Sequence, residues 1–206
     1  MKVGIVGGTG NFGRALAERL VTLGHEVVIG SRDAARAAEL AAVYGGEGKA
    51  NADAVRGVDL VVLATKSGAT LDTARDLAEA IGDTPVLCVA SDLRFEQGGI
   101  FPGRLGTSLA EEVAEILSAP VAAGLQSLAS VHLTEKEPTD QDALVCGDHD
   151  GAKELSLALA DELVAGRAID AGPLANARAL EGMTAVILHV NRRYRAHAGI
   201  RLTGLE

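Results

Sequence analysis

The chain has 206 residues, 48% of them hydrophobic, and a formal net charge of −9 at pH 7. This length suits a single domain over residues 1–206 with a substantial buried core, whereas the acidic charge argues against a nucleic-acid partner, because phosphate backbones select basic surfaces. The sequence has no apolar run of about 18 residues and no signal sequence, so we expect a cytoplasmic protein that does not enter a membrane.

A glycine turn follows the first predicted strand, residues 3–6, and leads into an amphipathic helix predicted over residues 11–23. Gly8, Gly10 and Gly13 have the Gly-x-Gly-x-x-Gly spacing of dinucleotide-binding proteins. Such glycines permit positive φ, close approach of a pyrophosphate and tight helix–strand packing, and the free amides of the helix point at the anion. The predicted cofactor-binding residues of this turn are Gly8, Thr9, Gly10, Asn11, Phe12 and Gly13.

The end of the second predicted strand, residues 27–29, indicates which dinucleotide is bound. NAD-binding proteins place Asp or Glu about 20 residues past the glycines, against the ribose 2′-hydroxyl. This chain has Ser31 and Arg32 there, a hydroxyl and a guanidinium that can hold the 2′-phosphate of NADP. Arg36 adds a second positive charge one helical turn later, and Asp33 is interpreted as the N-cap of that helix. The pattern favours NADP over NAD.

Further along the chain, apolar segments of strand length alternate with segments of helical periodicity. The remaining strands are predicted at residues 60–64, 86–89, 121–123, 143–145 and 168–169, and the remaining helices at residues 34–44, 70–81, 108–117 and 152–163. This order predicts an α/β fold, a doubly wound parallel sheet of Rossmann type with a C-terminal extension. We expect residues 1–122 to form the dinucleotide-binding core and residues 123–206 to complete a second-substrate cleft.

In an open α/β sheet the ligand lies beyond the carboxyl ends of the strands, so the loops after the strands at 60–64, 86–89 and 121–123 should surround the nicotinamide. The predicted residues of these loops are Ala64, Thr65, Lys66, Ala90 and Leu125. Phe12 and Leu125 are equally good candidates for a hydrophobic wall beside the reactive ring and for the core. The long loop at residues 91–106 suits a substrate-covering role.

The last predicted helix covers residues 174–197 and carries a single apolar stripe. The stripe consists of Leu180, Met183, Ile187, Val190 and Tyr194. The helix is longer than a small sheet needs, so its exposed remainder is expected to pack against a second subunit in a homodimer.

Four arginines lie in the acidic chain's last 16 residues: Arg192, Arg193, Arg195 and Arg201. They could receive an anionic second substrate. Alternatively, they interact with a helix C-terminus or a neighbouring subunit.

No catalytic residue and no metal site is predicted. The sequence lacks Gly-x-Ser-x-Gly, His-Glu-x-x-His, zinc-type Cys and His spacing, and a tyrosine followed four residues later by lysine. A dinucleotide site without an evident proton donor suits a protein that positions two cofactor rings for hydride transfer.

Five blocks in this order resemble the NADPH-dependent reductases of the deazaflavin coenzyme F-420 (F420). The blocks are residues 7–13 (GGTGNFG), 30–32 (GSR), 145–148 (VCGD), 170–174 (DAGPL) with Asn176, and 191–200 (NRRYRAHAGI). The resemblance implies reversible hydride exchange between C4 of NADP(H) and C5 of the deazaflavin, with stacked rings, generally in a homodimer.

Carried over by position, the resemblance implies that Thr9, Asn11 and Phe12 hold the pyrophosphate and nicotinamide side, and Ser31 and Arg32 the 2′-phosphate. The second ring would lie over the loops that follow the strands at 60–64, 86–89 and 121–123, near the C-terminal segment.

Two positions depart from the family pattern. Lys66 and Ser67 stand where archaeal members carry Pro-Trp, and Gln126 stands where the family usually has histidine. Both lie where the deazaflavin is implied to bind. The alternatives are therefore reduction of another small acceptor, such as an imine, carbonyl or flavin, or a non-catalytic NADP(H) sensor, since the glycines also fit Gly7-x-x-Gly10-x-x-Gly13.

Overall fold

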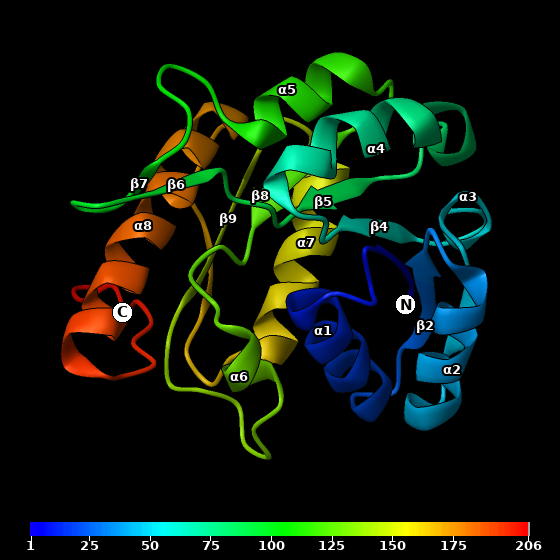
Figure 1. Cartoon of the computed structure of the whole chain (residues 1–206), viewed down its shortest axis with the longest axis horizontal. Helices are drawn as coiled ribbons and strands as arrows, with labels where there is room; N and C mark the ends of the chain where they lie inside the picture. Colours follow the sequence, from blue (N-terminus) through cyan, green and yellow to red (C-terminus); the bar gives the residue numbers. More distant parts are fainter. Residues whose placement is uncertain (206) are drawn as a thin grey trace.

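A computed structural model describes residues 1–205 and contains a central sheet with helices on both faces (Figure 1). Within these residues eight strands lie in the order β10-β9-β8-β5-β4-β1-β2-β3. Their bounds are β1 Lys2–Val6, β2 Glu26–Ser31, β3 Glu47–Ala50, β4 Leu60–Leu63, β5 Val86–Cys88, β8 Val121–Gly124, β9 Ala143–Gly147 and β10 Ala168–Asp170. The helices are α1 Asn11–Thr22, α2 Ala34–Tyr44, α3 Asn51–Ala54, α4 Ser67–Ile81, α5 Leu109–Ile116, α6 Ser130–Leu133, α7 Asp150–Leu163 and α8 Ala177–Tyr194.

Successive apolar side chains of a strand point to opposite faces of the sheet, so they are buried in two separate cores, one on each face. Val3 and Ile5 pack with α1, α2 and α7, whereas Val6 packs with α3, α4, α5 and α8. Each such fully buried side chain contributes about 1.5–3 kcal/mol relative to an exposed one. The predicted doubly wound fold is confirmed.

The sheet is parallel from β3 across to β8, but β9 pairs antiparallel with β8, and β10 then runs parallel to β9. The expectation of a parallel sheet throughout is therefore wrong for the last two strands. The chain between β8 and β9 contains only the four-residue α6, and β9 starts beside the end of β8, with Val145 opposite Gly124. A parallel connection would have needed a crossover that returns the chain to the opposite ends of the strands, usually along a helix.

The segment predicted as a loop at residues 91–106 contains an antiparallel hairpin, β6 Leu93–Glu96 and β7 Gly99–Pro102. The hairpin lies against α8 (Figure 1).

The C-terminal helix begins as a 3₁₀ turn, Leu174–Asn176, and continues as α8. Leu180 and Ile187 of the predicted stripe are buried, but Tyr194 is 73% exposed because it lies at the far end of the helix. The prediction of one buried stripe is thus wrong at Tyr194. Within residues 1–205, no helix has both the length and the apolar character needed to cross a membrane.

Candidate functional site

The glycine turn between β1 and α1 brings three backbone segments very close together. Gly7 has φ +81°, and a Cβ placed on Gly13 would lie 2.6 Å from the Gly7 carbonyl oxygen. A Cβ on Gly8 would lie 2.9 Å from Cγ2 of Ile29 in β2. Side chains at Gly8 and Gly13 would therefore force the helix away from the strands, which explains the glycine spacing in physical terms.

The first turn of α1 leaves backbone donors without helical partners. Gly10 is the N-cap and supplies no side-chain cap. The amide of Arg14 donates to the Gly10 carbonyl at 2.8 Å, so the amides of Asn11, Phe12 and Gly13 precede the first intrahelical bond. Together with the helix dipole, these amides form a site suited to an anion.

At the end of β2, Ser31 is buried and its Oγ accepts a hydrogen bond from the amide of Asp33 at 3.1 Å. Its hydroxyl proton therefore remains able to donate to an anion. Arg32 and Arg36 are exposed, and neither forms an ion pair among residues 1–205. Asp33 is the N-cap of α2 and accepts from the amide of Arg36 at 3.2 Å, as predicted.

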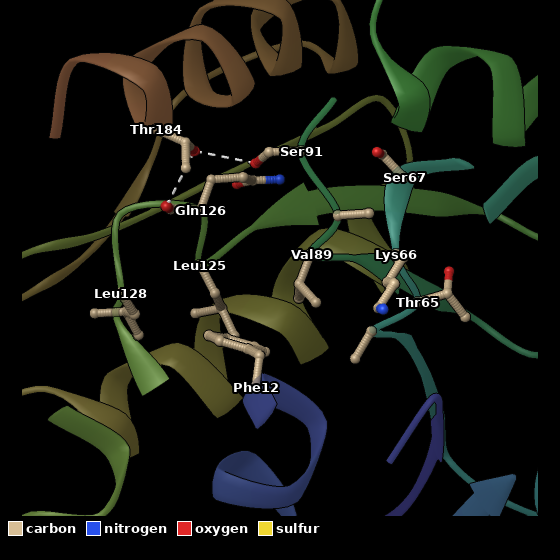
Figure 2. A pocket seen from close by; sticks show the side chains of 12 residues that line it. Phe12, Thr65, Lys66, Ser67, Val89, Ser91, Leu125, Gln126, Leu128 and Thr184 are labelled. Carbon is tan, nitrogen blue, oxygen red and sulfur yellow. Dashed lines mark hydrogen bonds between the residues drawn. The ribbon is translucent and has the colours of Figure 1, made fainter. Parts of the chain in front are cut away.

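A pocket of about 230 Å³ opens beyond the carboxyl ends of β4, β5 and β8, beside the start of α1 (Figure 2). Six predicted residues line it: Phe12, Ala64, Thr65, Lys66, Ala90 and Leu125. Ser67 and Gln126, the two departures from the family pattern, line it as well, and the lining residues that were not singled out from the sequence are Val89, Ser91, Leu128 and Thr184. The glycine turn thus meets the predicted loops at one place, as expected from the topology.

The apolar end of the pocket is formed by Phe12, Leu125, Leu128 and Val89 (Figure 2). Leu125 is 1% exposed and has φ +68°, a conformation that costs a non-glycine residue about 1–2 kcal/mol. It belongs to the core and also lines the pocket, while its place beside the reactive ring stays a prediction. Backbone strain of this kind is concentrated at functional sites.

The polar end of the pocket joins two loops to α8. Oγ of Ser91 and Oγ1 of Thr184 lie 3.0 Å apart, and Thr184 donates to the Gln126 carbonyl at 3.2 Å (Figure 2). The Gln126 side chain is 8% exposed; its Nε2 donates to the Cys88 carbonyl at 3.2 Å, and its Oε1 is buried without a partner. An amide nitrogen carries two protons, and only one of those on Nε2 is used in the bond to Cys88.

The pocket is almost free of charge. Lys66 is the one charged residue among those lining it in the described part of the chain. Cys88 lies behind Gln126, and burial raises the pKa of its thiol to about 12, so it is protonated at neutral pH. Such surroundings suit a planar neutral ring and do not supply a nucleophile.

The C-terminal arginines do not line this pocket. Arg192 and Arg193 lie in the last turn of α8, where they complement the helix dipole, and Arg201 pairs with Asp140. The hairpin segment predicted to cover the substrate contributes only Ser91, which precedes β6.

A mostly parallel sheet with a glycine turn at the β1–α1 junction and a pocket beyond the carboxyl ends of its strands is typical of dinucleotide-binding proteins. Comparison with known proteins gives the family. Residues 2–91 match the family of coenzyme F420-dependent NADP oxidoreductases. The F420-dependent NADP reductase of Methanothermobacter thermautotrophicus is 35% identical over 100% of this chain and 96% of its own length. That of Methanocaldococcus jannaschii is 33% identical, with 100% of both chains covered.

The chain belongs to the F420-dependent NADP reductase family. A crystal structure of a candidate F420-dependent NADP reductase from Arthrobacter sp. FB24 superimposes with a TM-score of 0.88 at 25% identity, covering 99% of this chain and 100% of that one. A Streptomyces aurantiacus imine reductase shares the fold, with a TM-score of 0.64 at 19% identity over 95% of this chain and 62% of that one.

Proposed function

We propose that this protein exchanges a hydride between NADP(H) and F420. The observation that carries the proposal is the nearly uncharged pocket at the carboxyl edge of the sheet, which adjoins the glycine turn. Family membership supports the choice of the two cofactors. When bound, they supply the chemistry, in which NADPH, oxidised F420 and a proton give NADP⁺ and reduced F420. The protein aligns the two rings and excludes water.

The NADP subsite would be built from two parts of the N-terminal half. The first-turn amides of α1 suit the pyrophosphate, with Gly8, Thr9, Gly10, Asn11, Phe12 and Gly13 as the contacting residues. Ser31, Arg32 and Arg36 would hold the 2′-phosphate through a hydroxyl donor and two guanidinium groups.

The reacting rings would meet in the pocket, against Ala64, Thr65, Lys66, Ala90 and Leu125. In this arrangement residues 1–122 form the dinucleotide-binding core. Residues 123–206 complete the second-substrate cleft, because Gln126, Leu128 and Thr184 come from that part of the chain.

The protein would act as a homodimer. An apolar groove between β7 and α8 is lined by Ile100, Pro102 and Val186, and Val186 is 62% exposed. Phe95 of the same hairpin is 71% exposed. Exposed apolar side chains gathered on neighbouring elements are typical of a subunit interface. The buried free thiols of Cys88 and Cys146 support a cytoplasmic location.

The reaction is tested by mixing the purified protein with NADPH and oxidised F420 and following the loss of deazaflavin absorbance. Turnover with F420, at a rate well above that with flavins, quinones or imines, is the expected result. NADPH binding without turnover of any acceptor would indicate a sensor. Preferential turnover of an imine would show that an imine, and not F420, is the second substrate.

A further inference from the structure

Asn51 places a side-chain amide against Gly30, the residue that precedes Ser31 in β2. It is the first residue of α3 and directly follows β3, in which Ala50 pairs with Ser31. A Cβ on Gly30 would lie 2.9 Å from Oδ1 of Asn51. Glycine at position 30 therefore leaves room for the Asn51 amide at the carboxyl ends of β2 and β3.

The two ends of this amide have different surroundings. Oδ1 of Asn51 is buried and has no hydrogen-bond partner among residues 1–205. Nδ2 forms no hydrogen bond within these residues either, but it reaches the surface, and the residue is only half-buried. A buried acceptor without a donor lowers the stability of a fold, so packing alone gives no reason to keep an amide here. The free N–H groups of Nδ2 indicate a contact with a ligand.

The position of the adenosine ribose follows from the two groups that it carries. Its C5′ bears the pyrophosphate, assigned to the glycine turn, and its C2′ bears the additional phosphate, assigned to Ser31 and Arg32. These two anchors meet at Gly30, because the amide of Gly8 donates to the Gly30 carbonyl at 3.1 Å and Ser31 is the next residue. A ribose held by both anchors lies across the end of β2 beside Asn51, with its C3′ between the two phosphorylated carbons.

We propose that Asn51 is a further cofactor-binding residue, whose Nδ2 donates to the 3′-hydroxyl oxygen of the adenosine ribose. The inference rests on NADP(H) being the cofactor in the proposed function. Ser31 and Arg32 would select the dinucleotide through the 2′-phosphate. Asn51 binds a hydroxyl group that NAD and NADP share, so it adds affinity without selecting between them.

The test is a calorimetric titration of wild type, Asn51→Ala and Asn51→Asp with NADP⁺ and NAD⁺. Asn51→Ala removes one neutral hydrogen bond, so the Kd of both dinucleotides should rise by about 3- to 10-fold. Asn51→Asp replaces the donor by a carboxylate, which can accept from the 3′-hydroxyl and repels the 2′-phosphate. Its Kd for NADP⁺ should rise by about 10-fold or more, whereas its Kd for NAD⁺ should stay within about 2-fold of wild type.

Two fragments of the cofactor locate the contact on the ribose. Adenosine 2′,5′-bisphosphate carries both anchors, and its 3′-deoxy analogue lacks only the hydroxyl group assigned to Asn51. Asn51→Ala should weaken binding of the first fragment by about 3- to 10-fold and of the second by less than about 2-fold, because both changes remove the same interaction. Equal losses for the two fragments, or a loss with NADP⁺ and none with NAD⁺, would overturn the assignment.

Asn191→Ala provides a matched control. Asn191 is also half-buried, and its Oδ1 accepts a hydrogen bond from the amide of Ala198 at 2.6 Å. It lies in α8, on the other side of the molecule from α3 (Figure 1). This variant should keep the wild-type affinity for every ligand. Wild-type affinity in Asn51→Ala as well would leave Asn51 with a structural role only and refute the proposal.

Binding also separates this inference from the proposed reaction. If NADP⁺ binds with the expected dependence on Asn51 but NADPH reduces neither F420 nor another acceptor, the ribose contact stands and the hydride-transfer function fails. If F420 is reduced while both Asn51 variants bind NADP⁺ as tightly as wild type, the function stands and the ribose contact is wrong.

Discussion

Glu181 of α8 accepts a hydrogen bond from the backbone amide of Ala110 at 3.3 Å, so a buried carboxyl group joins α8 to the first turn of α5. The side chain is 4% exposed. Burial raises the pKa of Glu181 to about 6, although hydrogen bonds from the amides of Leu109, Ala110 and Asp92 oppose the shift. Glu181 lies one helical turn before Thr184, and Asp92 follows Ser91, so the carboxyl group supports the polar end of the pocket from behind.

We predict that Glu181 makes the stability of the protein decrease with rising pH. Between its ordinary pKa of 4.5 and about 6, the native protein holds a proton that the unfolded chain has released. The stabilisation from this group is complete below pH 4.5 and lost as pH rises through 6, a change of about 2 kcal/mol. Glu181→Gln should therefore raise the free energy of unfolding relative to wild type above pH 6 and have little such effect below pH 4.5.

Urea denaturation at a series of pH values measures this difference. Glu115→Gln, which alters an exposed glutamate of α5, controls for removing one negative charge from the same region. A constant difference between Glu181→Gln and wild type from pH 4 to pH 8 would show that Glu181 does not titrate in this window.

Arg32 is expected to determine the choice between the two dinucleotides. Arg32→Ala should raise the KM for NADPH by about 10- to 100-fold, since a charge-assisted hydrogen bond to phosphate contributes about 1.5–3 kcal/mol. The KM for NADH should change much less, because NADH has no 2′-phosphate. Arg56→Ala removes an exposed arginine that precedes β4, toward the amino ends of the parallel strands, and should leave both values unchanged. An equal rise for both cofactors with Arg32→Ala would refute the assignment.

Gly13 is expected to tolerate no side chain. A Cβ there would lie 2.6 Å from Gly7 O and 2.8 Å from Gly8 Cα, both backbone atoms, so Gly13→Ala must displace the turn. The expected result is loss of NADP binding by calorimetry, with destabilisation of about 1–3 kcal/mol. Gly151→Ala alters a first-turn glycine of α7 with no atom within 4 Å of the new Cβ, and it should be neutral or slightly stabilising. Wild-type affinity in Gly13→Ala would mean that the turn adapts.

The sequence predicts those parts of the fold that depend on a few neighbouring residues. The β1–α1 turn and the helix over Ala34–Tyr44 depend on glycine spacing, apolar periodicity and an N-cap within a few residues. Strand β3 was missed because Glu47–Ala50 lacks an apolar run, and it forms only through its pairing with β2. The reversed direction of β9 is likewise set by how the preceding loop returns, which no strand pattern encodes.

The candidate site divides in the same way. The glycine turn, Phe12 and Leu125 follow strand ends and were predicted, whereas Thr184 carries no signal of its own within an apolar helix. It becomes a pocket residue only because it forms hydrogen bonds with Ser91 and Gln126. These two residues precede it by 93 and 58 positions. A search for polar residues inside the predicted apolar helix could have identified Thr184 as a candidate, but not its partners.

Val186 is expected to contribute to the subunit interface. It is 62% exposed on α8 and lines the apolar groove beside the hairpin. Val186→Asp places a charge where a second chain would bury apolar surface, so the protein should become monomeric in analytical ultracentrifugation at micromolar concentration, with its thermal stability lowered as the dimer is lost. Val43→Asp alters a valine of α2 that is 74% exposed and lies outside the groove, so this variant should remain dimeric. A Val186→Asp variant that still dimerises would place the interface elsewhere. A monomeric wild type would exclude the dimer.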